Sequence, residues 1–292
     1  MALDTHIGSL SLPSRRDALF RETPLQTAQR CVLGCAWGLM PARIGEVPDV
    51  VRAIARDLLA SRELPDAASA PPSGIAGIAH DLSPAVLRDA YSRGLFPLAH
   101  AGPIKWRSPP QRSLLFFAEL HIAKRLRRQM RQGRYTVTFD RDIEAVLKAC
   151  AGMRTGRLPL TWITPRIMRA YADAFDAGLV HSFEVWNERG ELAGGGYGVA
   201  TGGAFSTESQ FSHEPNTSKI GFTVLNFHLA RWGFAFDDGK LMTPTCRDMG
   251  FREVPRADYL ARLADAMRLA GRPGPWTCEA DVAAVADWQP SA

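Results

Sequence analysis

The order of elements expected along the chain predicts an α+β fold, a mixed sheet flanked by helices. Three segments in the C-terminal half alternate between apolar and polar residues, and short turns separate them. These expected strands are His181–Asn187, Leu192–Ala200 and Ala204–Phe211. Helical sequence stands before and after them, so we expect an antiparallel meander whose sheet is covered by helices.

The elements next to the meander have recognisable starts. Thr164 and Pro165 are an N-cap and a first helical residue, and the helix they open ends near Ala177. After the meander we expect, in order, a helix from Thr217 to Trp232, a strand near Gly233–Asp237 and a helix over Pro255–Leu269. This order of helices and strands is typical of the α+β class.

The N-terminal half divides into shorter pieces. Ser83 is a good N-cap before Pro84, and Gly94 ends the helix that they begin. Four prolines between residues 97 and 110 make the next stretch irregular. The other expected elements are a helix over Val50–Ala60, a linker over Pro65–Gly74, a strand over Tyr135–Phe139 and a helix over Asp142–Cys150.

These boundaries predict four units. Residues 1–73 are an N-terminal extension, and residues 74–112 a small N-terminal α/β domain. Residues 113–275 form the main domain, and residues 276–292 a C-terminal tail. We expect a monomer.

The composition of the chain limits the classes of protein to which it can belong. The 292 residues are 46% hydrophobic and 22% charged, which is ordinary for a globular protein. A net charge of +5 suits a polyanionic partner. The chain has no run of 18 apolar residues and no apolar core near its start, so we expect no membrane partner, no signal peptide and a cytoplasmic location.

The five cysteines are scattered and odd in number, which indicates a reducing compartment. Cys31 and Cys35 could share one helix face and bind a metal, but two small buried side chains are the commoner explanation. No second ligand pair stands at zinc spacing. We therefore expect no metal.

Residues 119–134 carry the strongest electrostatic signal. Six cations crowd together with only Glu119 in opposition: Lys124, Arg125, Arg127, Arg128, Arg131 and Arg134. Four of them share one helical face, opposite Ile122, Leu126 and Met130. The pattern fits a solvated surface helix or a contact with a phosphate backbone, and the unbalanced sign favours the phosphate contact.

The third expected strand carries a candidate carboxylate. Strict alternation places Ala204, Ser206, Glu208 and Gln210 on one side and the intervening residues, including Phe205 and Phe211, on the other. The Glu208 side is either a solvent face or the lining of a cleft. A cleft would be opened by the glycine-rich strand Gly194–Gly198, where a ligand can approach the backbone closely.

Asn216-Thr217-Ser218-Lys219 begins the helix after the meander. Its backbone N–H groups and the Lys219 ammonium can hold an anion, although plain N-capping by Asn216 or Thr217 needs no ligand. A meander followed by such a helix is similar to GNAT-type acyltransferases. The Gln/Arg-x-x-Gly-x-Gly/Ala loop of those that use acetyl-CoA is missing, so acyl-CoA is not favoured. The chain also lacks a P-loop and a dinucleotide fingerprint, and we expect no cofactor.

A series of short motifs runs from about Gly74 to Leu263. It comprises Asp81 to Pro84, Ala90 to Pro97, Trp106 to Pro109, Leu120 to Ile122, Thr161 to Thr164, His181 to Trp186, Glu208-Ser209, Asn216 to Lys219 and Glu253 to Arg256. In this order and spacing the motifs resemble those of the leucyl/phenylalanyl-tRNA–protein transferases.

The resemblance implies a GNAT-like catalytic domain behind a small N-terminal domain. It implies transfer of an aminoacyl group from tRNA to the α-amine of a protein with an N-terminal Arg or Lys, which marks that protein for degradation. The partners would be aminoacyl-tRNA and the acceptor protein. Metal and ATP are not needed, because the ester is already activated.

The resemblance also assigns residues. Glu208 matches the active-site Glu, and Asp238 matches the Asp of an Asp-x-Gln motif, placed by its twelve-residue spacing to Gly250. Asn216, Ser218 and Lys219 match the contacts of the tRNA 3′ end. The implied substrate-binding positions are Trp106, Trp162, Gly196, Phe205, Gln210, Leu225 and Asp237.

The chain departs from the family pattern at several positions. Lys240 replaces the catalytic Gln, and an ammonium has no hydrogen-bond acceptor, so it would stabilise the oxyanion or pair with Asp238. Leu98 stands where family members often have Trp or Met, and Arg107 replaces the second Trp of a Trp-Trp-Ser-Pro motif. The donor pocket holds Gly196, Gln210 and Asp237 at apolar positions.

We expect Glu208 and Asp238 to orient the amine, with altered donor or acceptor choice. The alternatives are an enzyme that acylates a small molecule and an inactive tRNA-binding relative.

Overall fold

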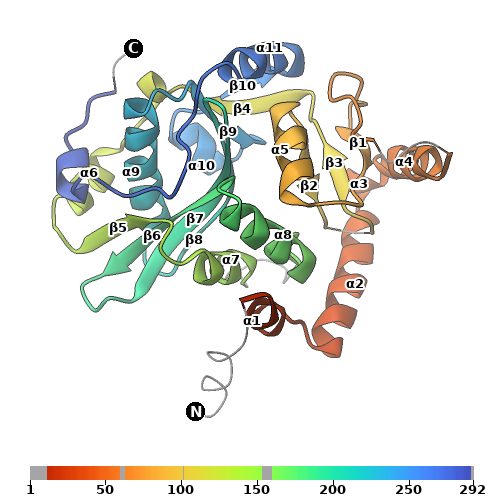
Figure 1. Ribbon diagram of the computed structural model, residues 1–292, viewed down its shortest axis with the longest axis horizontal. Helices are drawn as coiled ribbons and strands as arrows, with labels where there is room; N and C mark the ends of the chain where they lie inside the picture. Colours follow the sequence, from red (N-terminus) through yellow and green to blue (C-terminus); the bar gives the residue numbers. More distant parts are fainter. Residues whose placement is uncertain (1–11, 60–62, 101, 153–159, 291–292) are drawn as a thin grey trace.

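A computed structural model describes residues 12–59, 63–100, 102–152 and 160–290. A seven-stranded mixed sheet forms its centre, and helices cover both faces (Figure 1). The strand order is β10-β4-β9-β8-β7-β6-β5. In this sheet β8 and β9 pair in parallel, and all other neighbouring strands pair antiparallel. The predicted α+β class is confirmed.

The strands of this sheet lie close to their expected positions. Their bounds are β4 Gln111–Leu115, β5 Tyr135–Phe139, β6 Val180–Asn187, β7 Leu192–Thr201, β8 Ala204–Ser212, β9 Phe236–Lys240 and β10 Arg252–Pro255. The meander β6-β7-β8 and the strand β5 are as predicted. The strand after the meander begins at Phe236 and runs through Lys240, three residues later than expected from Gly233.

Helices pack on both faces of the sheet. One face carries α5 (Pro84–Ser92), α7 (Ile143–Ala151) and α8 (Pro165–Asp176). The opposite face carries α9 (Thr217–Arg231), and α6 (Lys124–Met130) and α12 (Val282–Val285) pack against α9. Two further helices, α10 (Pro244–Asp248) and α11 (Arg256–Ala266), flank β10.

Local capping explains several helix starts. Thr164 accepts a hydrogen bond from Ile167 N–H, and Asp142 accepts one from Ala145 N–H. The Ser83 hydroxyl makes no such cap, because it donates to Asp81 instead. Gly94 follows α5 with φ of +82°, where a Cβ would overlap Leu260.

The described part of the N-terminal region contains a second sheet and four further helices. The sheet has the order β1-β3-β2, made of Ile75–Ile78, Lys105–Arg107 and Phe96–Leu98, so the proline-rich stretch is partly strand. The extension folds into α1 (Leu12–Leu19), α2 (Pro24–Gly38), α3 (Pro41–Ile44) and α4 (Val47–Leu59). The helix expected from Val50 therefore begins three residues earlier.

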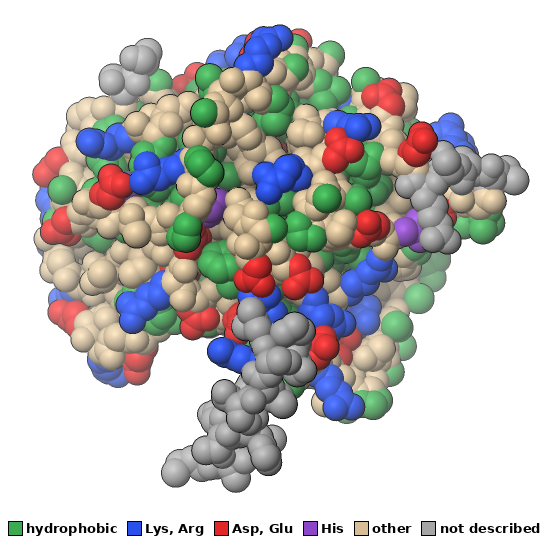
Figure 2. All heavy atoms as spheres, in the orientation of Figure 1, with side chains coloured by type: hydrophobic (Ala, Val, Ile, Leu, Met, Phe, Trp, Pro, Cys, Tyr) green, Lys and Arg blue, Asp and Glu red, His purple; other side chains and the backbone are tan. Residues whose placement is uncertain are grey.

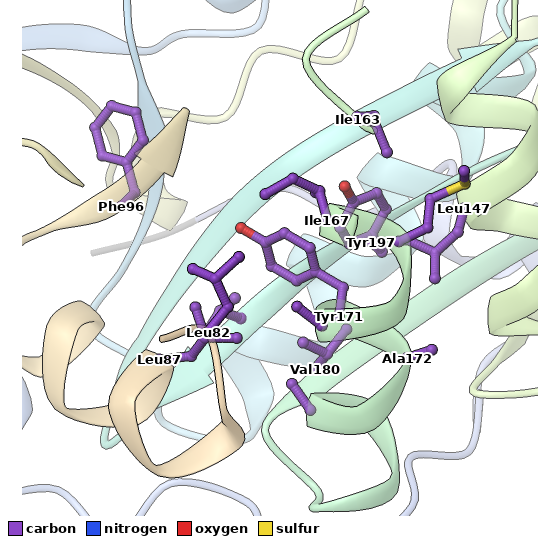
Figure 3. Packing of buried hydrophobic residues seen from close by; sticks show 14 of the residues in the cluster. Leu82, Leu87, Phe96, Leu147, Ile163, Ile167, Tyr171, Ala172, Val180 and Tyr197 are labelled. Atoms are coloured by element: carbon purple, nitrogen blue, oxygen red, sulfur yellow. The ribbon is translucent and has the colours of Figure 1, made fainter. Parts of the chain in front are cut away.

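Two large cores hold the layers together. The first lies between the sheet and α5, α7 and α8, where Leu87, Tyr171 and Tyr197 converge (Figure 3). The second lies under α9 and includes Phe205, Phe222 and Trp276. Trp276 is 1% exposed, so the segment predicted as a C-terminal tail contributes to the core. In the described residues no helix is long and apolar enough to cross a membrane.

Candidate active site

A β-bulge in β8 aims Glu208. Tyr197 pairs with Ser209 and the next residue, Gly198, pairs with Thr207, so Glu208 is an extra residue opposite β7. The bulge reverses the alternation of side chains along the strand. Phe205 consequently packs in the core under α9, whereas Phe211 packs in the core on the other face. The prediction that these two phenylalanines share one side was wrong.

The Glu208 carboxylate lies in a cage of polar groups from three elements. Its Oε1 accepts a hydrogen bond from the Tyr91 hydroxyl of α5 at 2.5 Å and forms an ion pair with Lys240 Nζ of β9 at 2.8 Å. Its Oε2 accepts one from the Tyr171 hydroxyl of α8 at 3.1 Å, and the two phenol oxygens are 2.6 Å apart. The Glu208 side chain is 1% exposed.

The two tyrosines act as neutral donors. Burial, and then the negative charge of Glu208, raise the pKa of Tyr91 and that of Tyr171 well above the ordinary value of 10.0. Both phenols therefore keep their protons at neutral pH and hold the carboxylate in one orientation.

Lys240 completes the cage in a strained backbone conformation. Its φ of +63° is in the left-handed region, where a non-glycine residue is uncommon. Its ammonium donates to the Thr207 carbonyl as well as to Glu208, and it lies 5.6 Å from the centre of the Phe96 ring. A carboxylate, a carbonyl and an aromatic face together form a binding site for an ammonium group.

Asp238 is engaged elsewhere. Its two oxygens accept hydrogen bonds from Arg112 Nε at 2.8 Å and from Arg112 Nη2 at 2.7 Å, and Tyr259 donates at 3.2 Å. Burial would raise the pKa of Asp238, but the Arg112 charge and hydrogen bonds outweigh it and lower that pKa. The predicted pairing of the Lys240 ammonium with Asp238 is wrong; the contact is from the Lys240 backbone N–H, at 2.8 Å. Asp238 thereby fixes the backbone that carries Lys240.

Asp237 lies beside Phe205, its parallel neighbour across β8 and β9. It is fully buried, and the Thr207 hydroxyl donates to its two oxygens at 2.8 and 3.0 Å. Burial raises the pKa of Asp237 to about 7, although Thr207 and Asn226 of α9 partly offset the effect. Leu225, on the same helix, is 1% exposed and belongs to the core that contains Phe205.

The glycine-rich strand β7 is filled by its neighbours. A Cβ at Gly196 would stand 2.7 Å from the Phe183 ring and 2.8 Å from Gln210 Cγ, and one at Gly198 would overlap the Phe205 ring. The glycines therefore admit neighbouring side chains. The interpretation that they open a cleft is wrong for this strand.

The two implied substrate-binding tryptophans lie on different sides of α5. Trp162 is half-buried with its ring edge-on to Tyr171, at 6.4 Å between ring centres, which places it next to the Glu208 cage. Trp106 is buried and lines a cavity of about 610 Å³ together with Val86 and Asp89 of α5. Tyr91, which contacts Glu208, occupies another face of that helix.

The six predicted phosphate-binding cations do not form one group. Lys124, Arg125, Arg128 and Arg134 are exposed. The others hold the C-terminal segment, because Arg127 Nη1 donates to the Ala286 carbonyl at 2.6 Å and to the Trp288 carbonyl at 2.8 Å, and Arg131 pairs with Asp287. On the face that Figure 2 shows, basic and acidic side chains are interspersed over the whole surface.

The start of α9 lies next to α6. Asn216 Nδ2 donates to Gln129 Oε1 at 3.0 Å, and Gln129 donates to the Pro215 carbonyl at 2.9 Å. Asn216 has φ of +66° and its side chain does not cap the helix. The Ser212 hydroxyl instead accepts from Ser218 N–H at 3.0 Å. The two predicted anion-binding segments are therefore neighbours, with Ser218 and Lys219 half-exposed.

Comparison with known proteins assigns the chain to a family. The leucyl/phenylalanyl-tRNA protein transferase model matches residues 114–264, and the model of the N-terminal domain of the same family matches residues 80–110. This chain belongs to that transferase family. A leucyl/phenylalanyl-tRNA–protein transferase of Alkalilimnicola ehrlichii is 42% identical over 216 residues, which are 74% of this chain and 83% of the relative. One from Azotobacter vinelandii is 45% identical over 198 residues, 66% of this chain and 87% of the relative.

Family membership places the Glu208 cage inside the matched region and the extension outside it. The sequence did not show that two tyrosines belong to the site. Tyr91 and Tyr171 stand in predicted helices, and the packing of those helices brings both hydroxyls to Glu208. Arg112 was missed because its partner is 126 residues away in the sequence.

The structure also places Cys31 and Cys35 differently from the expectation of two buried side chains. Both are exposed on α2, so the interpretation as two buried side chains is wrong. In the part of the chain that the structure describes, no three His, Cys, Asp or Glu residues converge as a metal site.

Proposed function

We propose that this protein transfers an amino acid from aminoacyl-tRNA to the N-terminal α-amine of a protein. The observation that carries the proposal is the ammonium site formed by Glu208, the Thr207 carbonyl and Phe96. An attacking amine arrives largely as an ammonium, since its pKa is about 7.7–8.0. The family membership supplies the donor, because the relatives are named for aminoacyl-tRNA and protein.

The proposed reaction starts when the acceptor ammonium displaces the Lys240 ammonium from Glu208. Glu208 then orients the ammonium, which releases one proton to water, and the neutral nitrogen attacks the ester carbonyl carbon. The C–O bond to the tRNA 3′ ribose breaks, and the second proton of the attacking nitrogen passes to the ribose oxygen, so that an amide, free tRNA and one released proton result. The displaced Lys240 donates a hydrogen bond to the tetrahedral oxyanion.

The roles of the remaining residues belong to the same proposal. Asp238 positions Lys240 through its backbone and does not touch the amine. The exposed cations Lys124, Arg125, Arg128 and Arg134, with Asn216, Ser218 and Lys219, contact the tRNA phosphates. The 3′ adenosine lies near Trp162, and the donor side chain near Phe205, Leu225 and Asp237. A single copy of the protein contains all of these residues. The proposed location is the cytoplasm, where charged tRNA is available.

The test is direct. Purified protein is incubated with tRNAs charged one amino acid at a time and with peptides that begin with Arg, Lys or Asp. We expect an amide product with at least one charged tRNA, and none with the Glu208→Gln variant. Failure to transfer from any charged tRNA would contradict the proposal.

A second candidate is a tRNA-binding protein that does not transfer. It is favoured by one observation, that the ammonium site is already occupied by the chain's own Lys240. Tight binding of charged tRNA without turnover, both in the natural protein and in the Lys240→Gln variant, would identify this function. Turnover only with a small amine would identify an enzyme that acylates small molecules.

A further inference from the structure

The N-terminal extension exposes most of the large apolar side chains that reach solvent in the described part of the chain. Nine large apolar residues from Leu25 to Leu58 are 38–79% exposed. Outside the extension, the exposed large apolar residues of the described chain are Leu241 and Leu269. The nine are Leu25, Val32, Leu39, Met40, Ile44, Val47, Val51, Ile54 and Leu58. Apolar patches larger than a few hundred Å² are rare on monomeric proteins and mark interaction sites.

Helix α2 is anchored along one side only. Gly34 is its one buried residue, and Trp37 stacks on His100 with 4.7 Å between ring centres. Arg30 pairs with Glu22 at 3.0 Å near the helix start. In Figure 1 the helix runs along the edge of the molecule, away from the seven-stranded sheet.

The outward side of α2 carries a symmetrical pattern. At about 100° per residue, five exposed residues fall within an arc of about 80°, on the side opposite Gly34 and Trp37. They are Leu25, Ala28, Val32, Ala36 and Leu39. Relative to Val32 they occupy positions −7, −4, 0, +4 and +7, so the order Leu-Ala-Val-Ala-Leu reads the same in both directions.

We propose that two copies of this chain associate through α2, in antiparallel orientation about Val32. A two-fold interface needs a self-complementary surface, in which residue i meets residue j of the other copy and residue j meets residue i. The pattern provides it, because Leu25 aligns with Leu39 of the second copy and Ala28 with Ala36. The alanines allow the helices to approach closely, and none of the five residues carries a charge that would repel its equivalent.

The size of this face predicts a weak dimer. Five side chains on one helix are far fewer than the roughly 20–30 residues per side of a standard interface. Stable complexes bury about 800 Å² per partner, so we expect association in the micromolar range. The proposal replaces the expectation of a monomer, and it is independent of the proposed reaction, whose residues lie elsewhere.

Sedimentation velocity on the full-length protein, from low to high micromolar concentration, tests the association. We expect the weight-average sedimentation coefficient to rise toward that of a dimer in the natural protein. Val32→Glu is expected to stay monomeric, with an unchanged circular dichroism spectrum. The matched control is Leu58→Glu on the apolar face of α4, which should dimerise normally. A monomer at all concentrations, or loss of dimer only with Leu58→Glu, would overturn the proposal.

A cross-linking experiment tests the register. Ala28 lies at −4 from Val32 and Cys35 at +3, which are about −40° and −60° around the helix, so Ala28 of one copy and Cys35 of the other are close together on the same flank of the pair. Ala28→Cys should give a disulfide-linked dimer through Cys35 of the second copy under mild oxidation. The double variant Ala28→Cys/Cys35→Ser should lose it, and Thr27→Cys, on the side of α2 away from the face, should not form it. Equal cross-linking with or without Cys35 would exclude this register.

Discussion

At the scale of single residues, the role of each carboxylate in the site depends on its hydrogen-bond and ion-pair partners. Glu208 has two phenols and one ammonium as partners, whereas Asp238 has a guanidinium and a phenol that leave it inaccessible. Both carboxylates could be singled out in the sequence, but their different partners could not. One partner of each carboxylate is more than 100 residues away in the sequence, Tyr91 for Glu208 and Arg112 for Asp238.

The Lys240 side chain is predicted to affect acceptor binding and chemistry in opposite directions. Lys240→Met removes the competing ammonium and the oxyanion donor together, so KM for an Arg-started peptide should fall several-fold. The kcat should fall by about 10²–10³, the usual loss for one oxyanion donor. Lys240→Gln should lower KM equally and keep more of kcat, because its amide can donate. Steady-state kinetics measure both, and an unchanged KM in both variants would contradict displacement of Lys240.

Asp237 is predicted to make stability fall as pH rises. Its pKa is about 7 in the folded protein against 3.8 for an unperturbed group, so the folded state favours the protonated form. Its contribution is fully present below about pH 4 and is lost as pH rises through 7, a difference of up to about 4 kcal/mol. Asp237→Asn keeps an acceptor for Thr207 and cannot ionise.

Urea unfolding at several pH values measures this effect. The difference in unfolding free energy between the natural protein and Asp237→Asn should shift in favour of the variant between pH 4 and pH 8. A difference that is constant with pH would show that Asp237 does not titrate in this range.

At the scale of elements, local signals predicted most helices and strands. Asp142 and Thr164 cap their helices through residues three positions later, and that information is local. The bulge at Glu208 depends instead on the register between β7 and β8, which alternation within β8 does not contain. For the same reason Phe205 and Phe211 were assigned to one side, although they lie in different cores.

The Arg112–Asp238 pair ties β4 to β9 and is predicted to be essential for folding. Both side chains are almost fully buried, so removing one partner leaves an uncompensated charge. Arg112→Met should lower the unfolding free energy by about 3–5 kcal/mol. The double variant Arg112→Met/Asp238→Leu should recover part of that loss, because no buried charge remains. Denaturant unfolding measures both, and additive losses in the double variant would contradict the coupling.

At the scale of the whole molecule, the chain combines a region matched by the family with an extension outside it. The extension is held to the main domain by Arg16 of α1, which pairs with Glu144 of α7 and Asp176 of α8. The sequence located this extension but not its helices α1 to α3. The start of α2 does carry a local signal that the prediction missed, the capping box of Thr23 and Gln26 around Pro24. The placement of α1 and α2 against the rest of the chain depends on contacts with distant residues, such as these ion pairs and the stacking of Trp37 on His100.

The molecule is predicted to bind tRNA through the surface formed by α6 and the start of α9. Neutralising one phosphate contact should reduce the slope of log K against log salt by about 0.7–0.9. Arg125→Gln and Arg128→Gln should each do so, and the double variant should lose about twice as much. Arg56→Gln, an exposed arginine on α4, is the control and should leave the slope unchanged. Titration of labelled tRNA at several salt concentrations gives these slopes. Equal slopes in all variants would contradict a tRNA contact at α6. A cation that contacts a phosphate contributes to the salt dependence of binding, so its removal must change the slope.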